Sequence, residues 1–233
     1  MTYFVSDIHG EYDLFRQLLD KIRFSDGDEM YIVGDMIDKG SKSVKLVDFV
    51  RAAPNIKAIL GNHEFEFLQY YYGLMRTAEN ANDIEQVLCG LQEHFPYKTE
   101  KLSWETVDFI ESLPFFVETD DFICVHAGVR TDENDVILPM DRQIAQVMVF
   151  DRDFKSPSFA LSPKNKTVLF GHTPCSFDNG DGKFLKTPKS GVATPSKLTD
   201  YAKIRLDNGV YQTGMLGALC LETMQEIYVK KQP

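Results

Sequence analysis

Short apolar runs alternate with amphipathic stretches along the first part of the chain. The apolar runs end in polar residues, as β-strands do, and cover Thr2 to Ser6, Met30 to Val33 and Ile56 to Leu60. Apolar positions at helical spacing follow each run, beginning near Leu14, Val44 and Glu64. Ser41 or Ser43 is expected to cap the second of these helices. Strand, loop and helix recur in this order three times, which predicts an α/β fold with parallel strands.

The middle of the chain has a different pattern. Residues 70–113 are mostly helical in spacing, with breaks near Gly73, Gly90 and Pro96, and we interpret them as a helical insertion or cap. Further strands are expected at Phe115 to Glu118, Phe122 to His126 and Thr167 to Phe170. A helix is expected from Arg142 to Phe150.

The last part of the chain looks like a group of closing antiparallel strands. They are expected at Lys203 to Leu206, Val210 to Gln212, Ala218 to Glu222 and Glu226 to Val229. The preceding stretch from Asp178 to Pro195 is rich in Gly, Lys, Thr and Pro and is expected to be an exposed loop. The length of 233 residues fits one large domain over residues 1–233 that can bury a full core.

Composition narrows the function classes. Lys and Arg number 25 against 35 Asp and Glu, which gives a net charge of −10 and argues against general nucleic-acid or anionic-membrane binding. No apolar run approaches the roughly 18 residues of a membrane span. The amino terminus lacks the pattern of a signal peptide, and the four cysteines are widely spaced, so we expect reduced thiols in a cytoplasmic protein. A local positive site made by bound cations remains compatible with this charge.

Polar clusters follow five of the predicted strands and hold four of the five histidines. They read Asp7-Ile8-His9-Gly10, Gly34-Asp35-Met36-Ile37-Asp38, Gly61-Asn62-His63-Glu64, His126-Ala127-Gly128 and Gly171-His172-Thr173. A single histidine after a strand is usually structural, but five such clusters at successive strand ends are not expected by accident. Because functional groups gather at the carboxyl ends of strands in α/β folds, the clusters predict one shared site.

The residue types in these clusters indicate a metal centre. Imidazole with carboxylate suits Zn, Fe or Mn rather than Ca. Asp7 and His9 can converge on one ion, and Asp35 is placed to bridge two ions. The neutral ligands available for the second ion are Asn62, His126 and His172. Two divalent cations would activate a water molecule and attract a phosphate group.

The order and spacing of the clusters resemble the phosphoprotein phosphatase branch of the calcineurin-like metallophosphoesterases, over Tyr3 to Thr173. Three segments look like the bacterial and phage serine/threonine phosphatase subgroup, which is related to the diadenosine tetraphosphatases. They are His126-Ala127-Gly128-Val129-Arg130, Phe150-Asp151-Arg152-Asp153-Phe154 and Lys203-Ile204-Arg205-Leu206-Asp207-Asn208-Gly209. The resemblance implies a calcineurin-like metallophosphoesterase fold, with a central β-sandwich flanked by helices.

The resemblance also implies roles for individual residues. One metal would be held by Asp7, His9 and Asp35, and the other by Asp35, Asn62, His126 and His172. His63 would be the general acid and Asp38 would orient and charge it, while a metal-bound hydroxide attacks phosphorus directly. The phosphate would be bound by Lys39 and Arg152. The chain departs from the family pattern at Ser6, at Lys39 and at Leu60, and the last two reduce the family's arginine clamp.

A dinuclear metal-dependent phosphomonoesterase is therefore expected, first of all a serine/threonine protein phosphatase, because Asp38 is retained where diadenosine tetraphosphatases commonly replace it. Manganese is the first expectation for the metals, with iron and zinc as alternatives. The substrate would be a phosphorylated protein or a small phosphate ester. One alternative function is a dinucleoside polyphosphate hydrolase, and another is a low-turnover metal-binding regulatory protein. The physiological substrate and the oligomeric state stay open.

Overall fold

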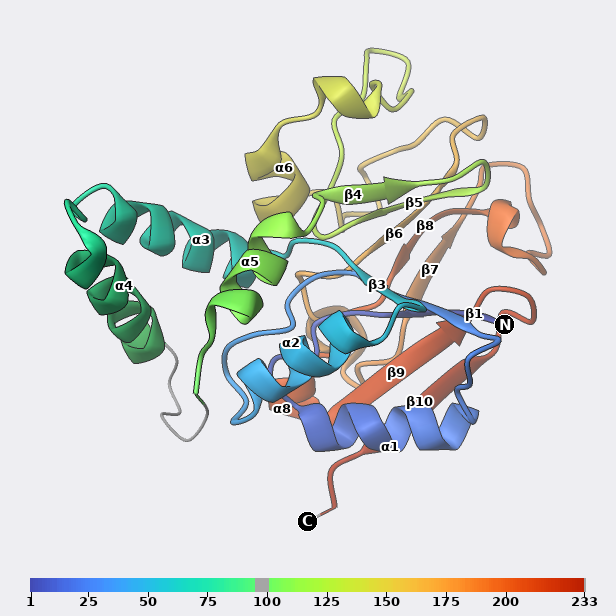
Figure 1. Cartoon of the computed structure of the whole chain (residues 1–233). Coiled ribbons are helices and arrows are strands. Elements are labelled where there is room, and N and C mark those ends of the chain that lie inside the picture. Colours follow the sequence, from blue (N-terminus) through green and yellow to red (C-terminus); the bar gives the residue numbers. More distant parts are fainter. Residues whose placement is uncertain (95–100, 233) are drawn as a thin grey trace.

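Two five-stranded sheets form the centre of the protein, as a computed structural model that describes residues 1–94 and 101–232 shows (Figure 1). The first sheet has the order β10-β9-β1-β2-β3. Its strands are β1 (Thr2–Val5), β2 (Glu29–Ile32), β3 (Ile56–Ala58), β9 (Met215–Cys220) and β10 (Glu226–Lys230). β1, β2 and β3 run parallel, as the repeated strand–helix pattern predicts, while β9 is antiparallel to both β1 and β10.

The second sheet has the order β4-β5-β6-β8-β7. Its strands are β4 (Phe116–Glu118), β5 (Phe122–Val125), β6 (Thr167–Phe170), β7 (Leu185–Pro188) and β8 (Tyr201–Arg205). β5, β6 and β8 are parallel, and the antiparallel strands β4 and β7 form the two edges. The carboxyl ends of the three parallel strands β5, β6 and β8 therefore lie on the same side of this sheet.

The two sheets pack face to face. Phe4 of β1 meets Phe122 of β5 edge to face, with ring centroids 5.0 Å apart, and Tyr31 of β2 meets the same ring at 5.5 Å. Neighbouring residues on these strands, such as Val5 and Ile123, point instead to the outer faces, where they join separate clusters. Because side chains alternate along a strand, the short apolar runs bury both of their faces.

Helices cover both outer faces (Figure 1). The first sheet is covered by α1 (Tyr12–Ile22) and α2 (Ser43–Ala52), while α5 (Trp104–Ser112) packs on α2 and on α3 (Asn62–Met75). α6 (Ala145–Phe150) covers the second sheet, and α4 (Ala81–His94) packs on α3. The remaining helical elements are short. They are two 3₁₀ turns, Met140–Arg142 and Leu198–Asp200, and two four-residue helices, α7 (Ser176–Asn179) and α8 (Val210–Thr213). Among the described helices, none has both the length and the apolar character needed to cross a membrane.

Several sequence expectations are wrong in detail. Val210 to Gln212 is helical, because Gly209 and Gly214, both with positive φ, bound a single turn that overrides strand propensity. The stretch from Asp178 to Pro195 is not only loop, since it contains β7. β8 is antiparallel to β7 but parallel to β6.

The helix boundaries also differ from expectation. Neither Ser41 nor Ser43 caps α2, since the cap position is Lys42 and Ser43 is the first helical residue. α3 begins at Asn62, two residues before Glu64. α3 and α4 continue through the glycines expected to break them, and Pro96 lies outside the described residues.

Candidate metal centre

The polar clusters lie together at the carboxyl ends of the strands. Seven side chains come from strand ends of both sheets, namely Asp7, His9, Asp35, Asn62, His63, His126 and His172. Backbone hydrogen bonds join the loops that carry them, with 2.9 Å from His9 N to Asp35 O and 2.8 Å from Gly171 N to His126 O. The parallel order of β1, β2 and β3 in one sheet and of β5 and β6 in the other brings these ends to one place.

Many of these residues have a left-handed backbone. Positive φ between 49° and 65° occurs at Asp7, His9, Asp35, Asp38, Lys39 and His172. Such a conformation costs of order 1–3 kcal/mol for a residue with a side chain. Its concentration in these loops indicates that the surrounding structure holds them for function rather than for stability.

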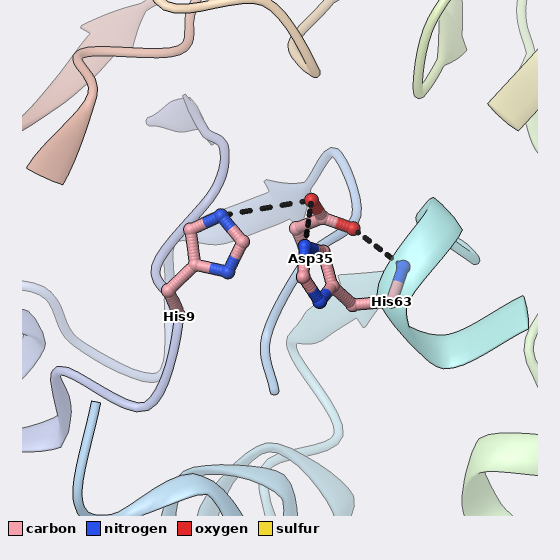
Figure 2. A group of neighbouring side chains, drawn as sticks. All are labelled: His9, Asp35 and His63. Carbon is pink, nitrogen blue, oxygen red and sulfur yellow. Dashed lines mark hydrogen bonds and ion pairs between the residues drawn. The ribbon is translucent and has the colours of Figure 1, made fainter. Parts of the chain in front are cut away.

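The first group of candidate ligands centres on His9. Its Nε2 lies 3.9 Å from Asp7 Oδ1 and 3.6 Å from Asp35 Oδ2. His9 Nδ1 lies 3.1 Å from the carbonyl oxygen of Ile37, an acceptor that orients the ring and leaves Nε2 for a metal. Figure 2 shows that His63 faces the same carboxylate, with its Nε2 3.9 Å from Asp35 Oδ2.

The second group centres on His126. Its Nε2 lies 3.4 Å from Asp35 Oδ1 and 3.1 Å from Asn62 Oδ1. His172 joins the group through Nδ1, which lies 2.8 Å from the same Asn62 oxygen. One carboxylate, Asp35, therefore faces His9 with one oxygen and His126 with the other. This is the arrangement that a bridging ligand between two ions requires.

Two of the candidate histidine ligands are held in the neutral form that metal binding needs. Burial lowers the pKa of His9 to about 4, and burial, with His126 nearby, lowers the pKa of His172 to about 3. Both rings are therefore neutral near pH 7, as a ligand must be. Burial also disfavours the charged form of His126, but the Asp35 carboxylate raises its pKa to about 10. The Asp35 carboxylate therefore favours the protonated form of His126, and a metal bound at Nε2 would displace that proton.

The carboxylates crowd one another in the same space. Burial raises the pKa of Asp7 well above its usual value, and Asp207 and Asp35 raise it further. Burial would also raise the pKa of Asp35, but His126, His9 and His63 hold it well below its usual value. Buried carboxylates at this density need compensating positive charge. Mixed imidazole, carboxylate and amide donors around that charge fit divalent transition metals.

His63 and Asp38 form a pair beside these groups. His63 Nδ1 lies 2.7 Å from Asp38 Oδ2. Burial lowers the pKa of His63, but the hydrogen bond to Asp38 and the charge of Asp35 outweigh it, and the net shift is upward. The imidazolium form is thus favoured, and its Nε2–H points to the candidate metal centre.

The expected phosphate-binding residues share one pocket with two of the histidines, His9 and His172. Lys39 and Arg152, both exposed, line it beside His9 and His172. Lys39 Nζ lies 2.8 Å from His9 Nε2. The positively charged ammonium group of Lys39 therefore lies next to the nitrogen that would bind a metal ion. Leu60 is buried and lines a separate groove between α3 and α5, together with Phe65 and other apolar residues.

Two acidic residues received no ligand role from the sequence. The Glu64 carboxylate is fully buried and accepts hydrogen bonds from the N–H groups of Asp35, Met36, Ile37 and Gly61, at 2.7–3.0 Å. It caps α3 and also fixes the loop that carries Asp35. Asp207 is buried in the same pocket as His9, and burial raises its pKa to about 6. The sequence signal that could have placed Asp207 at the site was its position in the motif Asp207-Asn208-Gly209.

Fold and donor set together define a metal-dependent phosphoesterase. A family model described as calcineurin-like phosphoesterase matches residues 2–202, and the chain belongs to that family. The expected resemblance and fold class are thereby confirmed. The family uses divalent metal ions, and the histidines and carboxylates described above are candidate ligands for them.

Several curated relatives share one name. A Vibrio parahaemolyticus protein named symmetrical bis(5′-nucleosyl)-tetraphosphatase is 32% identical over 130 residues, which are 55% of this chain and 44% of that protein. An Actinobacillus succinogenes protein of the same name is 32% identical over 135 residues, or 56% of this chain and 45% of that protein. The chain thus spans less than half the length of these relatives.

Solved structures support the fold. A candidate diadenosine tetraphosphatase superposes with a TM-score of 0.68 and 20% identity, over 99% of this chain and 93% of that one. A cold-active protein tyrosine phosphatase superposes with a TM-score of 0.56 and 15% identity, over 98% and 80%. At these identities the likeness concerns the fold alone.

Proposed function

We propose that this protein hydrolyses dinucleoside polyphosphates at a dinuclear metal centre. The observation that carries the proposal is the position of Asp35 between the His9 and His126 groups, next to the His63–Asp38 pair. The names of the relatives favour this substrate class. The serine/threonine protein phosphatase expected first from the sequence receives no support from those names, and the dinucleotide alternative fits them better.

The proposed ligand sets follow the two groups. Asp7, His9 and Asp35 would hold one ion, and Asp35, Asn62, His126 and His172 would hold the other. The donor atoms that lie within 4.8 Å of one another are those of His9, Asp35 and His63, and those of Asp7, Asp35 and His126, so Asp7 lies near both proposed ions. When bound, divalent cations act as Lewis acids that polarise the phosphoryl group and make water more acidic. Manganese is the proposed metal for both positions, with iron or zinc as alternatives.

The remaining residues would handle the proton and the substrate charge. His63 would donate its Nε2 proton to the leaving oxygen, and Asp38 would hold the ring in place and keep it charged. Lys39 and Arg152 would bind the phosphate oxygens from the mouth of the pocket. A pair such as His63 and Asp38 can protonate an ester or an anhydride leaving group, so retaining Asp38 does not separate the two substrate classes.

We also propose that residues 1–233 form a single domain and that residues 70–113 are a helical insertion beside the site. α4 packs on α3 in this region, and Tyr72 on α3 donates a hydrogen bond to Glu111 on α5 at 2.8 Å. A cytoplasmic location stays a prediction.

One substrate panel tests the proposed function. The purified protein with added Mn²⁺ is offered diadenosine tetraphosphate, p-nitrophenyl phosphate and a phosphopeptide set. We expect the highest kcat/KM on the dinucleotide. A higher kcat/KM on phosphopeptides than on the dinucleotide would instead support the hypothesis of a serine/threonine protein phosphatase. Bound metal without turnover of any substrate would instead indicate a regulatory metal-binding protein.

A further inference from the structure

Two aromatic side chains stand exposed at the mouth of the pocket that holds the candidate phosphate-binding residues. Phe177 is 62% exposed and Tyr211 is 63% exposed. Both line the pocket together with Lys39 and Arg152. Large aromatic side chains normally contribute their area to a core, so two such rings in water beside a polar pocket suggest a ligand surface.

The backbone holds both rings on short, well-anchored turns. Phe177 belongs to α7, whose preceding residue Cys175 is buried and donates its N–H to Asp207 O at 2.8 Å. Tyr211 belongs to α8, whose first residue, Val210, is buried. The buried neighbours fix the turns, while the rings point outward.

The two turns are also packed against each other. A Cβ atom placed on Gly209, which precedes α8, would lie 3.1 Å from Pro174 Cβ and 3.1 Å from Ser176 Oγ, at the start of α7. Phe177 and Tyr211 are therefore presented by adjacent pieces of backbone. The tertiary structure, not sequence proximity, puts them on one pocket.

The pocket thus offers two kinds of contact. Its cationic side chains, Lys39 and Arg152, suit a phosphate chain, and its exposed rings suit a flat aromatic group attached to that chain. A nucleoside polyphosphate has both parts. We propose that Phe177 and Tyr211 stack on a nucleobase of the substrate and make the enzyme prefer nucleotides over bare phosphate compounds. This inference rests on the proposed function and deepens it.

The test separates base recognition from hydrolysis. kcat and KM are measured for diadenosine tetraphosphate and for inorganic tripolyphosphate, which has no base, with Phe177→Ala and Tyr211→Ala. We expect kcat/KM on the dinucleotide, relative to tripolyphosphate, to fall about 5-fold to 150-fold per ring, the range given by base–aromatic stacking. Tyr211→Phe keeps the ring and should retain the preference. Tyr70→Ala, an exposed tyrosine on α3 outside this pocket, is the matched control.

Equal losses on both substrates, or no loss on either, would overturn the stacking role. A second measurement tests base stacking independently of the proposed function. It is the inhibition of tripolyphosphate hydrolysis by ADP. If the wild type does not cleave the dinucleotide, the proposed function fails, but weaker ADP inhibition in Phe177→Ala than in wild type would still support base stacking. Stronger inhibition by phosphotyrosine than by ADP would overturn the nucleobase as the occupant.

Discussion

His63 Nδ1 lies 2.7 Å from Asp38 Oδ2, and this contact turns His63 Nε2 toward Asp35 Oδ2 at 3.9 Å. The ring thus faces the candidate metal centre while one nitrogen is engaged by a carboxylate. This position allows two roles for His63, metal ligand or proton donor. The upward shift of its pKa, driven against burial by the Asp38 hydrogen bond, favours the donor.

The first prediction tests that role. His63→Asn should lower kcat by about 10²-fold to 10⁴-fold, the usual contribution of a general acid, while metal content per chain stays the same. Elemental analysis of the purified variant, alongside its kinetics, checks both parts. A collapse of metal content would show that His63 is a ligand and that the assignment as acid is wrong.

The second prediction concerns Glu64, whose buried carboxylate accepts four backbone hydrogen bonds. Glu64→Gln replaces one accepting oxygen by a donor that faces N–H groups, and should cost about 3 kcal/mol of unfolding free energy. Denaturant unfolding measures this cost. Glu66→Gln, on the exposed face of the same helix, is the matched control and should change stability by less than about 0.5 kcal/mol. Equal effects of the two variants would contradict the role of Glu64.

The third prediction concerns the close approach of backbone at Gly61. A Cβ there would lie 2.1 Å from Asp35 Oδ1 and 2.4 Å from Asp35 N, although the φ of −96° suits any residue. Gly61→Ala should therefore displace Asp35 and reduce both stability and metal binding. Gly73→Ala, where a Cβ meets no atom within 4 Å inside α3, should instead stabilise the protein by about 0.5–1 kcal/mol. Thermal melts and Mn²⁺ titration of both variants check this; tolerance of Ala at Gly61 would refute the steric argument.

The fourth prediction is a pH dependence that arises away from the metal centre. Arg205 is buried and pairs with Asp178, and this hydrogen bond lowers the pKa of Asp178 below its usual 3.8. Because the folded-state pKa is the lower one, the pair stabilises the protein above the unfolded pKa, and this stability is lost as pH falls through the folded pKa.

Asp178→Asn should therefore lower the Tm at neutral pH, and its difference from wild type should shrink below about pH 4. Melting curves between pH 3 and pH 7 measure the difference. Asp120→Asn, at an exposed position in the turn before β5, is the control. A Tm difference that stays constant down to pH 3 would count against the pair.

The fifth prediction concerns metal removal. Asp7, Asp35 and Asp207 are buried close together, and cations would offset their mutual repulsion. Chelation should lower the Tm, and Mn²⁺ at 100 times its Kd should restore about 2.7 kcal/mol per site. Calorimetry with and without chelator measures the effect. An unchanged Tm would mean that no bound metal offsets the charge of these carboxylates.

Much of the fold follows from local pattern. Parallel β1, β2 and β3 are readable from the alternation of apolar runs and amphipathic stretches, because the period of the pattern reports which faces are buried. The errors fall where local preference loses to context. Val210 has strand propensity but lies in a helical turn between Gly209 and Gly214. β7 was missed because its pairing with β8 is long-range and its own sequence resembles a loop.

The sequence by itself determined the family, the fold class and the set of candidate ligands, because motif order and residue chemistry are local properties of the chain. Only the tertiary structure decided how those residues meet. It placed Asp35 between His9 and His126 and brought Glu64 onto the Asp35 loop. It also set Phe177 and Tyr211 on one pocket. The physical reason is that each contact joins segments distant along the chain, whose approach is set by the packing of two sheets and not by any local preference.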